Sequence, residues 1–208
     1  MTERPRPSSI AGGCLCGAIR FTIRFPNDSD WPPKGNGICQ CTMCRKHSGS
    51  LLPQNISFPV ANLTPNISSL PTYKTYASTP TTSRGFCSTC GSPLTFNDDK
   101  DRDLIEINIG AFDEEVLIGE KVEEEAWEDG YGRHVPRKGG WGYELGLPKY
   151  HIFAENEVQG VTDGFGGDKW LTDREGGQSF KGKASEMKRM SEAARVISGG
   201  RTEGESTV

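Results

Sequence analysis

Residues 39–44 read CQCTMC, three cysteines within six positions, and they lie between two further cysteine pairs. The first pair is in GGCLCGA, residues 12–18, and the last is in FCSTCG, residues 86–91. All 7 cysteines of the chain belong to these clusters: Cys14, Cys16, Cys39, Cys41, Cys44, Cys87 and Cys90. Free buried cysteines usually occur singly, so three tight clusters point to metal binding.

The grouping of two, three and two cysteines predicts two zinc ions of different kinds. Structural zinc is almost always held by four ligands, whereas catalytic zinc commonly keeps three protein ligands and an open position. The two distant pairs can meet across a sheet and supply four thiolates, which closes a long loop. We therefore expect Cys14, Cys16, Cys87 and Cys90 to hold a structural zinc. The trio Cys39, Cys41 and Cys44 then holds an open zinc from one local turn.

Two other interpretations of the cysteines are open. The CxxC of Cys87 and Cys90 is also the spacing of a thioredoxin-type redox pair, but no βαβ pattern surrounds it. Both zinc ions would be structural if a histidine completed the trio, and the chain has 3 candidates: His47, His134 and His151.

Composition favours one small domain in which metal binding supplements the core. The chain has 208 residues, which suits a single domain with appendages. Hydrophobic residues make up only 34%, beside 26 glycines and 13 prolines, so loops are abundant and the apolar core is lean.

Charge and the absence of targeting patterns exclude several classes of protein. The formal net charge of −4 disfavours a nucleic-acid-binding surface. No apolar run suits a signal peptide or a membrane span, so no membrane partner is expected. A cytoplasmic, reducing location follows as the expectation, and there closely spaced cysteines serve as metal ligands more often than as disulfides.

Hydrophobic alternation predicts a mainly β fold with little helix. In AIRFTIRF, residues 18–25, every second side chain is apolar, which is the period of a half-buried strand. Further strands are expected at residues 55–60, 73–77, 93–96, 104–112 and 150–154. Helix is expected only after Cys41 and over residues 185–197. The predicted fold is a zinc-stabilised, sandwich-like β-sheet domain.

Composition shifts divide the chain into a domain and its appendages. Residues 1–9 are expected to form a flexible N-terminus, and residues 10–172 the zinc domain. Residues 113–148 begin with acidic residues and then turn glycine-rich, which predicts a long loop insert or lid. Residues 173–208 are a polar tail that can bury little apolar surface.

The order of the motifs resembles the glutathione-dependent formaldehyde-activating enzyme family, which includes centromere protein V. The resemblance covers residues 10–170 and rests on GGCLCGAIRF, CQCTMCRKHSG, RGFCSTCGSPLTF, INIGAFD and HIF. It implies a β-sheet zinc fold shared with a small guanine-nucleotide-exchange accessory protein. It also implies the same division into four structural and three catalytic zinc ligands. The activity it implies is that of a carbon–sulfur lyase, which interconverts S-hydroxymethylglutathione with glutathione and formaldehyde.

An open zinc site with three thiolates suits this chemistry, because such a soft ion favours another sulfur ligand. A thiol such as glutathione and an aldehyde are therefore the expected small-molecule partners. Glutathione carries two carboxylates, so cations should lie near the trio, and we expect substrate contacts from Arg45, His47 and Arg84. The alternative function is a non-catalytic binding or scaffold protein in which both zinc ions are structural.

Overall fold

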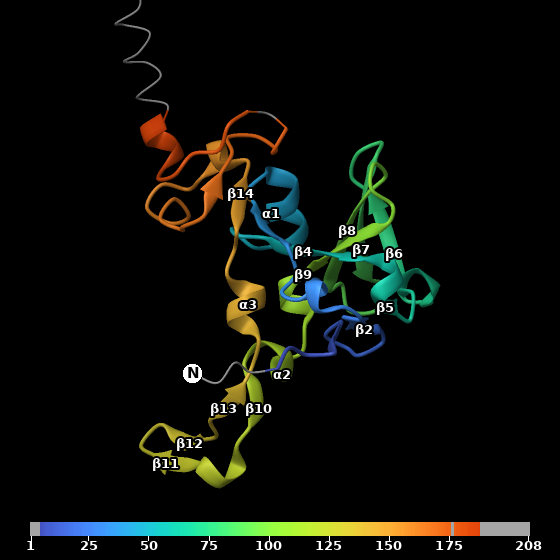
Figure 1. Ribbon diagram of the computed structural model, residues 1–208, viewed down its shortest axis with the longest axis vertical. Coiled ribbons are helices and arrows are strands. Elements are labelled where there is room, and N and C mark those ends of the chain that lie inside the picture. The colour runs from blue at the N-terminus through green and yellow to red at the C-terminus, as the bar shows by residue number, and fades with distance from the viewer. Residues whose placement is uncertain (1–4, 176, 188–208) are drawn as a thin grey trace, which may run out of the picture.

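In the computed structural model, which describes residues 5–175 and 177–187, the chain forms one large sheet, one small sheet and two pairs of short strands (Figure 1). The eight strands of the large sheet are, in spatial order, β15 (Asp168–Lys169), β14 (Tyr150–Ile152), β3 (Gly35–Cys39), β4 (Gln54–Pro59), β9 (Leu104–Asn108), β8 (Pro93–Asp98), β7 (Thr82–Cys87) and β6 (Tyr73–Ala77). The small sheet contains β1 (Ser9–Gly13), β2 (Arg20–Arg24) and β5 (Leu63–Thr64). The predicted mainly β fold is confirmed.

The core joins the small sheet to one face of the large sheet. Alternation in β2 buries Phe21 and Ile23, as predicted. Ile56 in β4 lies opposite Ile107 in β9, and both are fully buried in the same cluster. Burial of each such side chain stabilises the fold by about 1.5–3 kcal/mol. Because one cluster contains residues of both sheets, the arrangement is sandwich-like.

The opposite face of the large sheet carries different side chains. One row of register neighbours runs across five strands from β3 to β7: Gly35, Ser57, Glu106, Phe96 and Arg84. Directly opposed residues of paired strands share a face. We call this surface the polar face, and it carries the trio site described below.

The helix predicted after Cys41 is α1 (Thr42–Ser48), which follows β3 directly. It ends at Gly49, whose φ of 68° is the left-handed conformation that favours glycine at a helix C-terminus. Of the helix predicted over residues 185–197, residues 185–187 are helical and the rest lies outside the described residues.

The predicted loop insert over residues 113–148 contains regular structure. It forms α2 (Glu114–Leu117), β10 (Gly119–Lys121), β11 (Trp127–Asp129), β12 (Gly132–His134), β13 (Arg137–Gly139) and α3 (Gly142–Gly146). β10 pairs with β13 and β11 with β12, and this arm projects from the two sheets (Figure 1). Two features explain how the chain turns between β11 and β12 at the tip of this arm. Asp129 accepts a hydrogen bond from the Tyr131 amide, and Gly132 has a φ of 118°.

Short 3-10 turns connect other elements, at Asp28–Asp30, Val60–Asn62, Ile67–Ser69, Ile109–Ala111, Glu123–Glu125 and Ala154–Asn156. Among the described residues, no helix has the length and apolar character needed to cross a bilayer.

Both predicted appendages contact the sheets. The Arg6 guanidinium donates to Asp28 and to the Phe25 carbonyl, so residues 6–9 of the expected flexible N-terminus are tied to the small sheet. In the expected polar tail, Phe180 forms a bridge with Lys169. Phe180 is also buried in a second, small apolar cluster with Ala154 and Ala184. These apolar contacts cross the predicted boundary at residue 173.

Candidate metal centres

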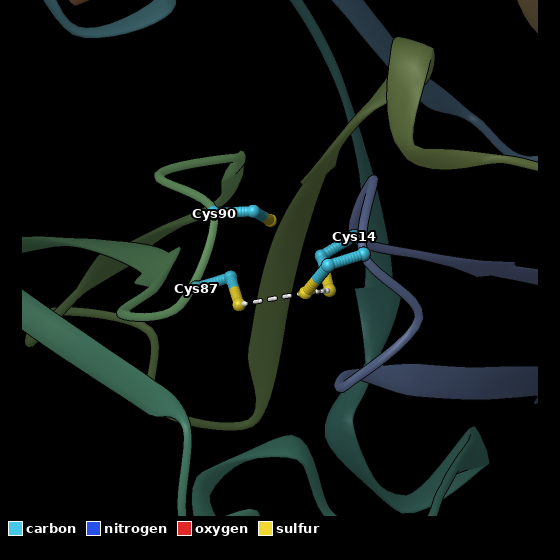
Figure 2. Close-up of side chains that lie close together, drawn as sticks. Cys14, Cys87 and Cys90 are labelled. Atoms are coloured by element: carbon cyan, nitrogen blue, oxygen red, sulfur yellow. Dashed lines mark hydrogen bonds between the residues drawn. The ribbon is translucent and has the colours of Figure 1, made fainter.

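Four cysteines from two turns form the first cluster, which we call the quartet. Cys14 and Cys16 lie in the turn between β1 and β2, and Cys87 and Cys90 lie at the turn between β7 and β8. Their four Sγ atoms all lie within 4.8 Å of one another. Figure 2 shows Cys87 and Cys90 on one turn facing Cys14 on the other. The quartet therefore links the small sheet to the large one.

The quartet has the dimensions of a closed tetrahedral zinc site. With Zn–S bonds of about 2.3 Å, tetrahedral geometry places sulfur atoms about 3.8 Å apart. The distance between Sγ atoms is 3.5 Å for Cys14 and Cys16 and 3.9 Å for Cys16 and Cys87. Hydrogen bonding from Ser92 lowers the pKa of Cys90 to about 5.

The second cluster, the trio, lies where β3 leads into α1. Cys39 ends β3, Cys41 is the N-cap of α1, and Cys44 is in its first turn; their Sγ atoms lie within 4.8 Å of one another. The Cys44 amide donates to Cys41 Sγ at 3.3 Å, so the helix start positions that sulfur. A hydrogen bond from Cys39, with a smaller contribution from Cys44, lowers the pKa of Cys41 to about 2. Both clusters can hold a metal ion.

Arg84 joins the trio to the polar face. Its Nη1 and Nη2 atoms each lie 3.5 Å from Cys44 Sγ, and the side chain is 4% exposed. The guanidinium also lies over the Phe96 ring, 5.2 Å from its centroid. The Arg84 Nε is buried without a hydrogen-bond partner. The predicted site residue Arg84 is therefore beside the trio, with one donor unused.

The other two predicted substrate contacts differ from Arg84. Arg45 donates to the Asn156 carbonyl and to Gln40 Oε1, so its guanidinium ties α1 to the segment after β14. His47 has a buried Nε2 without a partner, and burial followed by the Arg84 charge lowers its pKa. The imidazole of His47 is therefore neutral at physiological pH.

Within the described part of the chain, no histidine completes the trio as a fourth ligand. His134 pairs with Asp129 and stacks on Trp127 in the projecting arm. His151 Nε2 lies 2.8 Å from the Gly166 carbonyl oxygen.

A cleft that the sequence did not reveal extends across the polar face. It has a volume of about 1010 Å³, and Gly35, Ser57, Glu106, Phe96 and Tyr150 are among the residues that line it. The Arg84 guanidinium lies over the ring of the lining residue Phe96 and contacts Cys44. A second lining residue, Ile152, is the register neighbour of Cys39. These contacts connect the cleft to the trio, although neither Arg84 nor a cysteine of the trio is among the residues that line it. Its only sequence signal is the alternation of polar and apolar residues in β4 and β9.

Of the comparisons with known proteins, the family model agrees with these motifs. The family model described as glutathione-dependent formaldehyde-activating enzyme matches residues 9–129, which include all seven cysteines. Among solved structures, a crystal structure of a Rhodobacter sphaeroides protein is similar at 18% identity with a TM-score of 0.39. That similarity covers 50% of this chain and 89% of the other. A comparison with curated proteins finds no significant match.

Proposed function

Because the chain belongs to the glutathione-dependent formaldehyde-activating enzyme family, we propose that it is a zinc-dependent carbon–sulfur lyase. Its proposed substrate is S-hydroxymethylglutathione, formed or broken down, or a related adduct of a thiol and an aldehyde. The observation that carries this proposal is the trio, which offers three sulfur ligands with the Arg84 guanidinium against one of them.

The two cysteine clusters suit different roles. The quartet offers the four ligands that a closed structural zinc requires, whereas the trio leaves one tetrahedral position for a ligand. When bound there, zinc supplies a soft Lewis acid that favours the thiolate form of a sulfur ligand at neutral pH. Cys39, Cys41 and Cys44 would hold it.

The reaction needs one bond to break and one proton to move. In breakdown, the electron pair of the carbon–sulfur bond stays on sulfur, the hydroxyl loses its proton, and the carbonyl of formaldehyde forms. Formation is the reverse. Arg84 lies against Cys44, so its positive charge offsets the negative charge of the clustered thiolates. Neutral His47, with its unpartnered Nε2, is suited to accept and pass on the proton.

Activity is tested by following S-hydroxymethylglutathione breakdown against the spontaneous rate. Zinc-loaded protein should accelerate it, and Cys44→Ser should abolish the acceleration together with one equivalent of bound zinc. Lys46→Ala is the matched control, because Lys46 is exposed on the same helix, and it should behave as wild type. If zinc-replete protein neither binds glutathione nor changes the rate, the non-catalytic scaffold is the better interpretation.

A further inference from the structure

Gln40 is a buried polar residue that the proposed reaction does not use. It lies between the first two sulfur ligands of the trio, Cys39 and Cys41, and it is fully buried. Glutamine is usually exposed, and a buried polar side chain is normally held by hydrogen bonds. Gln40 is joined to both ligand residues through the backbone. Whatever fixes Gln40 therefore also restrains these two ligands.

Two donors meet at the side-chain oxygen of Gln40. Thr162 Oγ1 donates to Gln40 Oε1 at 2.8 Å, and Arg45 Nη2 donates to the same oxygen at 3.0 Å. Because a guanidinium can only donate, the amide presents its oxygen and not its nitrogen to both groups. Gln40 Nε2 is buried without a hydrogen-bond partner among the residues that the structure describes. The two bonds to Oε1 therefore hold this side chain in place.

Thr162 belongs to a segment after β14 that we call the strap, residues 156–163. Thr162 is fully buried, and its amide donates to the Val158 carbonyl at 2.9 Å. Its hydroxyl accepts from the Val158 amide, also at 2.9 Å. The oxygen is thus fixed within a turn of the strap, and its single proton is directed at Gln40.

The strap is anchored at both ends. Near its end, Lys169 of β15 donates to the Asp163 carbonyl at 2.9 Å and forms an ion pair with Glu157. The side chains of this pair are only 1% and 5% exposed. At the start of the strap, Arg45 of α1 donates to the Asn156 carbonyl at 2.6 Å. Because a buried ion pair is costly to break, these contacts hold the strap in one position against α1.

The trio depends on such outside support because its ligands come from one short run of the chain. All three sulfurs belong to residues 39–44, so no distant ligand fixes their spacing. The backbone of the run is held by the Cys39 amide, which donates to Pro53, and by the Gln40 amide, which donates to Ile152. Groups that orient metal ligands without binding the metal typically change its affinity by about 10–100-fold when they are removed.

We propose that Thr162 is a positioning residue for the trio and acts through Gln40. Its hydroxyl fixes the Gln40 side chain, and the Gln40 backbone keeps Cys39 and Cys41 at the spacing that a metal requires. The strap lies outside residues 9–129, the part of the chain that matches the family model, so this role belongs to a segment beyond that match. The inference rests on the proposed function in one respect, because it takes the trio as a metal site.

The test measures zinc affinity at the trio by competition with a chromogenic chelator, and Cys44→Ser protein, which keeps the quartet, gives the contribution of the quartet. Thr162→Val replaces the hydroxyl with a methyl group of similar size, and it should weaken zinc binding at the trio about tenfold. Thr162→Ser keeps the hydroxyl and should keep the wild-type affinity. Cobalt bound in place of zinc gives a second readout, because its visible absorption depends on the geometry of the thiolate ligands. The cobalt spectrum should change in Thr162→Val and not in Thr162→Ser.

Controls separate the possible failures. Ile23→Val removes one methyl group from the core under the small sheet, so it lowers stability away from the trio and should keep the wild-type zinc affinity there. Equal weakening by Ile23→Val and Thr162→Val, or wild-type affinity in Thr162→Val, overturns the positioning role and leaves the proposed function intact. If wild-type protein binds no metal at the trio, both fail. Should Thr162→Val not fold, Gln40→Met removes the acceptor instead, and wild-type zinc affinity in that variant overturns the proposal.

Discussion

Substituting one cysteine of each cluster should separate a structural metal from an open one. Cys16 is exposed and Cys41 is only partly buried, so serine at either position leaves no significant cavity. Serine at position 41 also keeps an N-cap oxygen for the Cys44 amide, because serine is a favoured N-cap residue. The difference in stability between Cys16→Ser and Cys41→Ser therefore measures the difference between the stability contributions of the two metal sites.

The size of the difference follows from the loops that each metal closes. The quartet joins residues 71 positions apart, as Cys16 and Cys87 show. Treated as a cross-link, such a loop contributes about 4 kcal/mol, whereas the trio, which spans five positions, contributes about 2 kcal/mol. For a chain of this size these losses lower the melting temperature by about 8–16 °C and about 4–8 °C. Loss of the zinc-binding free energy destabilises the protein further. This additional loss is larger for the quartet, because that site forms only when the two sheets meet.

Thermal unfolding followed by circular dichroism, with zinc measured on the same samples, is the appropriate assay. Cys41→Ser should lose one zinc and keep a single cooperative transition, and Cys16→Ser should be unfolded, aggregated or much less stable. Equal losses from the two substitutions would refute the division into a closed and an open site, and would favour two structural zinc ions.

Two further outcomes are expected. Protein purified without chelator should contain two zinc ions per chain by elemental analysis, and a ratio near one would remove the second site. Burial, with a smaller contribution from Asp98, raises the pKa of Glu106 above its ordinary value of 4.5, so the native state holds this proton at a higher pH than the unfolded state. The carboxylate therefore destabilises the ligand-free protein increasingly as pH rises through the raised pKa. Chemical unfolding should find Glu106→Gln more stable than wild type at pH 7, with a gain that vanishes at acidic pH; a gain independent of pH would contradict this reasoning.

The sequence predicted those parts of the fold that depend on local patterns. Alternation identified β2 and β9, because each of these strands buries one face against an apolar core. Cysteine spacing identified the two clusters, because a metal requires several ligands within a few ångströms.

Other parts depend on contacts that no local pattern records. The glycine-rich strands β1 and β3, SIAGG and GNGIC, have little alternation, and their neighbours in the sheets hold them in place. Recognition of Glu106 as a lining residue of the cleft requires the register that places it between Ser57 and Phe96. The hydrogen bond from Arg45 to the Asn156 carbonyl could not be predicted for the same reason, since the two residues are 111 positions apart.

The cleft is lined by residues from both inside and outside the part of the chain that matches the family model. Every cysteine lies within residues 9–129, the part that matches the family model. One wall of the cleft comes from β14 and the segment that follows it, through Tyr150, Ile152 and Arg174, which lie outside that match. Because β14 pairs directly with β3, Ile152 is the register neighbour of Cys39, and this wall contributes no ligand to the trio. The residues that hold the metal can therefore stay fixed while the residues of this wall vary, and we expect such changes to alter which thiol is bound before they alter the carbon–sulfur chemistry.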